Sequence, residues 1–317
     1  MVTDQYFWSC DWGSSSFRLY FVESESCKII SSFSSSEGIT KLAKLNNHIA
    51  DCCHNYLSDI VQRLSKESGI SGKFPCVLSG MTSSAHGWRP LDYSSVPFNL
   101  SGSTLKYEEL DTDIEQIKKL YFLSGVKTDS DVMRGEETEL MGLFEQEDYQ
   151  VFSKDCTVII PGTHSKHIII KDGKLTNFNT FMTGEMFDLL SQHSVLRNNI
   201  EKGNENSSAF TDGVKKSQDN EILNSLFSVR TNDLFNKYTK VENYHFLSGL
   251  LIAYELKSCA GYSGHIVLYA NEKMRNLYEQ TFEILYPDLK VNIIKSDNVA
   301  SIYGHRAFLK NLSDFNL

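Results

Sequence analysis

Hydrophobic and polar positions follow the same order of elements in two stretches of the chain. In the first stretch, Gln5–Asp11 and Phe17–Val22 have the two-residue period that is typical of strands, and Lys28–Phe33 predicts a third strand. The pattern then predicts a helix over Ile39–Ser68 and a short buried strand at Cys76–Ser79. Strands that alternate with helices in this way indicate an α/β fold.

The second stretch repeats this plan. Three strands are predicted at Cys156–Ile160, Lys166–Ile170 and Leu175–Phe181, and a helix follows them. Further along, the pattern predicts helices at Tyr244–Ser258, Glu272–Tyr286 and Asn298–Asn311, and a strand at His265–Ala270. Because an internal repeat of this kind defines an architecture, we expect two similar domains with a cleft between them. The expected boundaries are 1–148 for the first domain and 149–297 for the second, with the final helix (298–317) returning to the first.

A turn rich in glycine and hydroxyl residues joins the first two predicted strands of each copy. Such a turn offers backbone N–H groups and hydroxyls to an anion, and no bulky side chain stands in the way. Asp11 ends the first strand, where a carboxylate would hold a hydrated Mg²⁺ that bridges phosphates. Taken alone, each turn is equally compatible with a solvent-exposed loop. The predicted phosphate-binding residues are Gly13, Ser14, Ser15, Ser16 and Arg18 in the first turn and Gly162, Thr163, His164 and Ser165 in the second.

An acidic segment from Asp131 to Glu139 precedes apolar residues at helical spacing. One interpretation is that these carboxylates only balance the dipole of a helix that starts near Gly135. The other is that one of them accepts the proton of an alcohol during phosphoryl transfer, which needs such a group.

Composition limits the partners and the compartment. The chain has 317 residues, a net charge of −9 and 7 cysteines without a CxxC pair. The negative charge argues against a nucleic-acid partner and against an anionic membrane surface. An odd cysteine count with irregular spacing indicates reduced thiols and a cytoplasmic protein, and we find neither a membrane-spanning run nor a secretory signal.

The motifs resemble those of the 2-dehydro-3-deoxygalactonokinases, a family within the actin-like ATPase and sugar kinase superfamily. The resemblance runs in family order from Asp11 to Leu256 and implies two ribonuclease-H-like domains. It also implies transfer of phosphate from ATP, with Mg²⁺, to the 6-hydroxyl of 2-dehydro-3-deoxy-D-galactonate. The matching stretches are DWGSSSFRLY, SGMTSSAHGW, DVMRGEETELMGLF, IIPGTHSKH, TFMTGEMFDLLSQHSVL and FLSGLLIAYEL.

The resemblance also suggests individual site residues. In related sugar kinases an acidic residue after a glycine is the catalytic base, and Gly135-Glu136 is in a comparable place here. Glu136 is therefore the expected base and Glu137 the next candidate, with Glu185 and Asp131 after them. Superfamily members place a glycine-rich turn under the adenine, and this chain has Ala270 there. The expected substrate-binding residues are Glu37, Gly38, Met81, Thr82, Trp88, Arg134, Lys166 and Glu185.

Two other functions fit the sequence less well. A kinase for a different sugar or sugar acid would keep the same motifs, because fold does not fix the substrate. A non-catalytic sugar-sensing protein would be expected to have lost a phosphate turn or the acidic helix start, and both are intact. The sequence contains no motif that decides the oligomeric state, and a homodimer is compatible with it.

Overall fold

The computed structural model describes residues 5–45, 48–219, 221–262, 264–295 and 299–312. Contacts between these residues divide the chain into two compact units. The first unit runs to Lys154 and includes Lys171–Asn177 and the C-terminal helix α9 (Ala300–Lys310). The second unit comprises Asp155–Ile170 and Phe178–Ser296. The functions expected for each domain, and the cleft between them, stay predictions.

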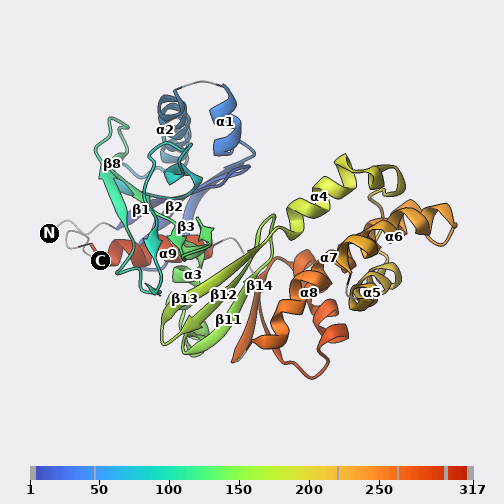
Figure 1. Cartoon of the computed structure of the whole chain (residues 1–317). Helices are drawn as coiled ribbons and strands as arrows, with labels where there is room; N and C mark the ends of the chain where they lie inside the picture. The colour runs from blue at the N-terminus through green and yellow to red at the C-terminus, as the bar shows by residue number, and fades with distance from the viewer. Residues whose placement is uncertain (1–4, 46–47, 220, 263, 296–298, 313–317) are drawn as a thin grey trace. The chain divides into compact units, whose positions relative to one another are not determined.

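The first unit is built on a six-stranded sheet with the order β3-β2-β1-β4-β8-β7. Strands β1, β2 and β3 are antiparallel neighbours, whereas β4 pairs parallel with both β1 and β8. Figure 1 shows these strands in blue to green. Their bounds are β1 Tyr6–Trp12, β2 Phe17–Glu23, β3 Ile29–Ser35, β4 Phe74–Gly80, β7 Tyr107–Leu110 and β8 Ile117–Leu123.

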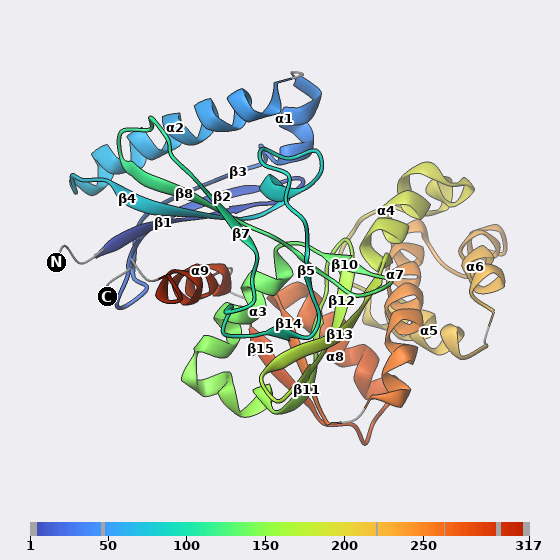
Figure 2. The same ribbon diagram turned by 60° about the vertical axis from the view of Figure 1, so that its left-hand side comes forward.

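Helices cover both faces of this sheet (Figure 2). The alternation in β1 turns Trp8, Cys10 and Trp12 toward helix α2 (Ile49–Ser68), and their side chains are fully buried in one core. On the opposite face, Ser9 Oγ lies 2.7 Å from His305 Nδ1 of α9. Helix α9 packs there beside helix α3 (Glu136–Glu145).

The second unit repeats the strand order of the first. Its strands β15-β14-β11-β12-β13 are adjacent in that order, and β14 pairs parallel with both β11 and β15. Both units thus have the ribonuclease-H-like arrangement, and the predicted α/β fold class is confirmed. The strands are β11 Asp155–Ile160, β12 Ser165–Lys171, β13 Lys174–Phe181, β14 His265–Ala270 and β15 Val291–Lys295.

The described helices of the second unit pack around one central helix, and Figure 1 shows them in yellow to orange. Helix α7 contacts α4, α5, α6 and α8, so it lies at the centre of this group. The helices are α4 Thr183–His193, α5 Ser207–Lys216, α6 Ile222–Leu234, α7 Lys240–Leu256 and α8 Glu272–Leu285.

The structure differs from the sequence expectations in the first unit. The expected single helix over 39–68 is two helices, α1 (Ile39–Leu45) and α2, with residues 46–47 outside the described part. Short strands that the pattern did not predict are β5 Ser94–Ser95, β6 Phe98–Asn99, β9 Val126–Lys127 and β10 Val132–Met133. Among described helices, none has the length and apolar character needed to cross a bilayer. All seven cysteines are free thiols.

Candidate active site

The first Gly-hydroxyl turn joins β1 to β2. The strands pair in register up to Asp11 opposite Arg18 and Trp12 opposite Phe17. The turn closes when the Gly13 N–H donates to the Ser16 carbonyl at 2.8 Å. Ser14 and Ser15 are exposed, so the turn is accessible from solvent, and its binding of an anion stays a prediction.

Gly38 packs directly against this turn. A Cβ atom at Gly38 would lie 2.2 Å from the Ser14 carbonyl oxygen, which no side chain can tolerate. The next residue, Ile39, donates its N–H to the Gly13 carbonyl at 3.0 Å. Gly38 therefore lets the start of α1 support the turn. This is a different role from the substrate contact expected for it.

The second turn has the same support. Gly162, Thr163 and His164 are exposed at the β11–β12 connection. A Cβ atom at Gly184 would lie 2.6 Å from the Gly162 carbonyl oxygen, and the Glu185 N–H donates to the Thr163 carbonyl at 3.0 Å. In each unit, then, a glycine at a helix start packs against the turn between the first two strands. This shared packing explains why a glycine precedes or begins the helix in both copies of the sequence repeat.

Carboxylates gather at the end of β1 in the first unit. Asp11 Oδ2 accepts from Arg18 Nη1 at 2.8 Å. Burial raises the pKa of the Asp11 carboxyl, Arg18 opposes this, and Glu136 raises the pKa further. Two glycines with positive φ allow the end of β4 and the start of α3 to come close to each other near Asp11. Gly80 (φ 80°) lies beside Asp11, and a Cβ on Gly135 (φ 111°) would lie 3.5 Å from Gly80 Cα.

The two expected bases have different surroundings at the start of α3. Glu137 is 1% exposed, and its oxygens accept from the Gly135 N–H at 2.8 Å and the Thr138 hydroxyl at 3.0 Å. Burial, followed by the neighbouring Glu136, raises the pKa of Glu137 to about 7. Glu136 is half-buried, and one of its oxygens accepts from the Arg134 N–H at 3.0 Å. Glu137 therefore holds the Gly135 backbone, whereas Glu136 is the more accessible carboxylate.

Glu139 belongs to the same cluster and was not among the predicted site residues. Burial, followed by Asp11 and Glu136, raises the pKa of Glu139 to about 8. Its position three residues after Glu136 puts both on one face of α3, and this spacing was the signal in the sequence that could have identified it.

Glu139→Gln is expected to change how the melting temperature, Tm, depends on pH. A carboxyl whose folded pKa of about 8 exceeds its ordinary 4.5 binds its proton more tightly in the folded state. Its contribution to stability is complete below the unfolded pKa and is lost as the pH rises toward the folded value. Because Gln has no such proton, the Tm of the variant relative to the wild type should rise between these two pKa values. Melting curves across that range test this, and a pH-independent difference would contradict it.

The other predicted substrate residues of the first unit are largely engaged by the protein itself. Trp88 is 8% exposed and packs edge-on against Trp12 and Phe122, with ring centroids 6.5 Å and 5.2 Å away. Thr82 is fully buried and Met81 packs on the same core. The carbonyl of Glu37 accepts from Trp12 Nε1 at 2.8 Å, and its side chain pairs with Lys41.

Arg134 holds the segment that follows β4. Its guanidinium donates to Ser83 Oγ at 2.5 Å and to the Leu91 carbonyl at 3.3 Å. Its Cζ atom also lies 4.3 Å from the centre of the Tyr93 ring. These contacts fix the orientation of the Arg134 guanidinium, one of the candidates for binding the substrate carboxylate.

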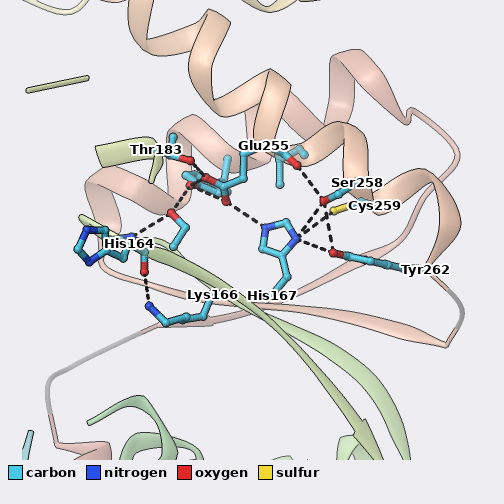
Figure 3. Close-up of polar contacts among 12 residues, drawn as sticks. His164, Lys166, His167, Thr183, Glu255, Ser258, Cys259 and Tyr262 are labelled. Carbon is cyan, nitrogen blue, oxygen red and sulfur yellow. Dashed lines mark hydrogen bonds and ion pairs between the residues drawn. The ribbon is translucent and has the colours of Figure 1, made fainter. Parts of the chain in front are cut away.

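In the second unit, the predicted residues border the second turn. His164 Nε2 lies 2.6 Å from Glu185 Oε2, across the surface of the turn. Lys166 is 4% exposed and donates to the His164 carbonyl at 2.8 Å, so it supports the turn from below. Figure 3 shows His164 and Lys166 at one end of a larger set of polar contacts.

A cavity of about 460 Å³ in the second unit opens at this turn. Gly162 and Thr163 line one end of it, and helices α4, α5, α7 and α8 supply the walls. Its volume lies in the range typical of small-molecule sites. That a nucleotide binds here, with its base among the helices and its phosphates at the turn, is a prediction. The apolar side chains of the wall include Phe210, Leu251, Met274 and Leu277, and its cations are Lys202 and Lys273.

Ala270, which was expected to contact the adenine, is not among the residues that line this cavity. Ala270 is 4% exposed and belongs to the core between β14 and the helices. The cavity wall comes instead from the next element, α8, through Lys273, Met274 and Leu277. The sequence predicted α8 as a helix but gave no signal that its first turns border a cavity.

Comparisons with known proteins identify the family of this chain. A family model described as 2-keto-3-deoxy-galactonokinase matches residues 11–302. The chain is 31% identical over 274 residues to a probable 2-dehydro-3-deoxygalactonokinase of Rhizobium meliloti (strain 1021), a match that covers 84% of each protein. It is 28% identical over 287 residues to the 2-dehydro-3-deoxygalactonokinase of Escherichia coli (strain K12), covering 88% of this chain and 90% of that one.

A solved structure extends the similarity to three dimensions. A crystal structure of a putative 2-dehydro-3-deoxygalactonokinase protein from Sinorhizobium meliloti matches with a TM-score of 0.79 and 27% identity, over 95% of both chains. The sequence match spans nearly the whole chain and includes both turns and the acidic start of α3. The chain therefore belongs to the 2-keto-3-deoxy-galactonokinase family, the kinases that phosphorylate this sugar acid with ATP.

Proposed function

We propose that this kinase transfers the γ-phosphoryl group of ATP to the 6-hydroxyl of 2-dehydro-3-deoxy-D-galactonate. The bond from O6 to the γ-phosphorus forms, the bond from that phosphorus to the β,γ-bridging oxygen breaks, and ADP leaves. The observation that carries the proposal is the pair of exposed Gly-hydroxyl turns, one of which ends a nucleotide-sized cavity. A phosphate group is the kind of ligand that a turn with exposed backbone N–H groups would bind.

Glu136 is the proposed general base. It would accept the proton that O6 loses as the phosphoryl group arrives. Its side chain is half-buried and one of its oxygens accepts from the Arg134 N–H, whereas Glu137 is buried and holds the Gly135 backbone. Asp11 is paired with Arg18, and Glu139, with a pKa near 8, keeps its proton at neutral pH.

Mg²⁺ fits this cluster only as an ion carried by the phosphates. Among the described residues, no group of three or more His, Cys, Asp or Glu side chains is arranged to hold a metal. Mg²⁺ in kinases commonly keeps several waters and binds one or two carboxylates besides the phosphates. Asp11 is the residue that would hold one of those waters. Its Oδ1 lies 3.6 Å from the position that a side-chain Cβ would occupy at Gly80, and glycine keeps that position empty. The bound ion would neutralise charge on the phosphates.

Arg134 is the proposed partner of the substrate carboxylate. A guanidinium recognises a carboxylate in a planar, two-pronged geometry that a lysine cannot offer. Ser83, Leu91 and Tyr93 hold the plane of this guanidinium, so little side-chain entropy is lost when an acid binds. Lys166 is less suitable, because it is buried and donates to a carbonyl of the second turn.

The test is substrate-dependent release of ADP by the purified protein, with 2-dehydro-3-deoxy-D-galactonate compared with its gluconate epimer, with D-galactonate and with D-galactose. We expect kcat/KM to be at least about 100-fold higher for the proposed acid than for the neutral sugar. NMR of the product should place the phosphate on O6, and a chelator should abolish turnover until Mg²⁺ is restored.

Two outcomes would contradict the proposal. Equal turnover of the neutral sugar would remove the carboxylate from recognition and favour a kinase of another substrate. Binding of the acid without release of ADP, at any Mg²⁺ concentration, would favour the sugar-sensing alternative.

A further inference from the structure

A buried polar network lies beneath the second turn, and phosphoryl transfer as described above makes no use of it. Its centre is Glu255 of α7, which is 3% exposed, beside the fully buried His167 of β12. Figure 3 shows Glu255 with donors around it and His167 on one side. We call this set the Glu255 network; its members are Ser165, His167, Thr183, Glu255, Tyr262 and Tyr278.

Three different elements donate hydrogen bonds to the Glu255 carboxylate. The Tyr278 hydroxyl of α8 lies 3.0 Å and 2.9 Å from its two oxygens. His167 Nε2 of β12 lies 3.0 Å from Oε1, and the Thr183 hydroxyl of α4 donates to Oε2. An ionised carboxylate only accepts, so a buried one needs such donors to offset its lost hydration. Glu255 thereby ties α4, α8 and β12 to α7.

The hydrogen-bond pattern assigns the proton of His167. Because Nε2 faces a carboxylate, it carries the hydrogen, and Nδ1 is left to accept from the Tyr262 hydroxyl at 2.9 Å. Burial raises the pKa of Tyr262, so the phenol keeps the proton that it donates. The Ser258 hydroxyl of the segment after α7 lies 3.3 Å from both His167 Nδ1 and the Tyr262 hydroxyl, and none of these contacts on the Nδ1 side of His167 involves the turn.

A second branch runs from Glu255 to the turn. The Tyr278 hydroxyl, which donates to Glu255, lies 3.2 Å from Ser165 Oγ. Ser165 Oγ in turn accepts from the Gly162 N–H at 3.3 Å. Burial and the Glu255 charge raise the pKa of Tyr278 well above its usual value, so this phenol stays protonated. All donors then point one way, from Gly162 through Ser165 and Tyr278 to Glu255, and such chains strengthen each bond.

Thr183 provides a third branch, on the other side of the turn. It is the first residue of α4, and the following Gly184 packs against the Gly162 carbonyl and Thr163. Gly162, Thr183, Gly184 and Tyr278 all line the cavity, whereas Glu255 does not. The carboxylate therefore holds cavity-lining groups from behind, on two sides of the turn.

We propose that Glu255 is a positioning residue that fixes the second turn in the conformation that binds phosphate, and so sets nucleotide affinity without touching the nucleotide. The inference rests on the proposed function, in which the cavity and the turn bind ATP. It assigns to the nucleotide site a residue one layer behind its wall.

Glu255→Gln is the decisive variant. The side chain keeps its size, but its amide nitrogen cannot accept, so a buried donor that faced the second oxygen loses its partner. The dissociation constant of MgADP and the KM for ATP should each rise about 10-fold, because the turn is no longer held. The KM for the sugar acid should stay within about twofold, since the acid-binding residues lie in the first unit. Calorimetry with MgADP and steady-state kinetics measure these values.

Tyr262→Phe is the matched control. It also removes one phenol hydroxyl from the network, but from the branch that ends at His167 and not at the turn. Its affinity for MgADP should stay within about twofold of the wild type. Equal losses in Tyr262→Phe and Glu255→Gln would overturn the proposal, because any damage to the network would then have the same effect.

Ser165→Ala keeps the proposal testable if Glu255→Gln does not fold. It breaks the branch at the turn and leaves the other donors of Glu255 in place. Ser165→Ala should lower the affinity for MgADP about 10-fold. If Glu255→Gln folds, the double variant should bind MgADP no more weakly than the weaker-binding single variant, because both changes break the same branch. Folded Glu255→Gln protein with a lower Tm and wild-type MgADP affinity would give Glu255 a purely structural role. Failure of the wild type to bind MgADP would instead overturn the proposed function.

Discussion

Glu136→Gln is expected to lower kcat by about 10²- to 10⁴-fold, the usual contribution of general-base catalysis. Gln keeps the size of the side chain and can still accept from the Arg134 N–H, so the start of α3 should be preserved. The hydroxyl of the acid can also still be held, and its KM should change little. Steady-state kinetics on the folded variant, with thermal melting as the folding check, measure both quantities.

Glu137→Gln and Glu139→Gln are the matched controls on the same helix. Glu137 has a pKa of about 7, which suits a base, but both its oxygens are occupied by groups of its own helix start. Geometry takes precedence over pKa in identifying a base, so Glu137→Gln should lower Tm more than kcat. Because burial raises the pKa of Glu139 to about 8, its carboxyl is largely protonated at neutral pH. Glu139→Gln should therefore leave kcat nearly unchanged.

The same variants also define the results that would assign the general base to a residue other than Glu136. If Glu137→Gln is inactive while Glu136→Gln has nearly normal kcat, the base is the neighbouring carboxylate and α3 must rearrange when substrate binds. If both retain activity, the proton goes elsewhere, and Glu185 and Asp131 are the next residues to test. Glu185 is the weaker of these two, because its carboxylate already pairs with His164.

The sequence predicted those elements whose buried positions form a clear apolar pattern within their own segment. His265–Ala270 was predicted with the observed bounds, because every position from Ile266 to Ala270 is apolar and buried. Strand β8 was missed: Lys118 and Lys119 are adjacent and break the alternation, although Ile117, Leu120 and Phe122 are buried. Such a strand is recognised only through its pairing with β4, which is a contact distant in sequence.

The site shows a similar division between local and distant information. Motif and order along the chain predicted the two turns and the acidic start of α3, which are local features. The role of Gly38 depends on the backbone of Ser14, and Trp88 depends on the rings of Trp12 and Phe122. The cavity wall depends on helices α5, α7 and α8 meeting in space. None of these contacts leaves a pattern within its own segment.

Gly13→Val and Gly162→Val are expected to weaken MgATP binding by about 10- to 100-fold while the protein stays folded. Neither glycine has a positive φ that would require it. A Cβ on Gly13 would lie 3.3 Å from Ser16 Oγ, which can rotate away, and a Cβ on Gly162 would meet nothing closer than 4.0 Å. Internal packing therefore does not require glycine at either position, whereas the close approach of a phosphate, as proposed, would. Losing one or more charge-assisted hydrogen bonds to backbone N–H groups gives the expected loss.

Gly261→Val is the control for the effect of adding a side chain at an open glycine. Gly261 also has open space around its Cβ position and no positive φ, and it does not line the cavity. Calorimetric titration with MgATP, without acid substrate, should show near wild-type affinity for it and clear losses for the two turn variants. If Gly13→Val binds normally while Gly162→Val does not, only the second turn contacts nucleotide in the absence of the acid. Normal binding by both would mean that neither turn approaches the phosphates, since the substitutions change little else.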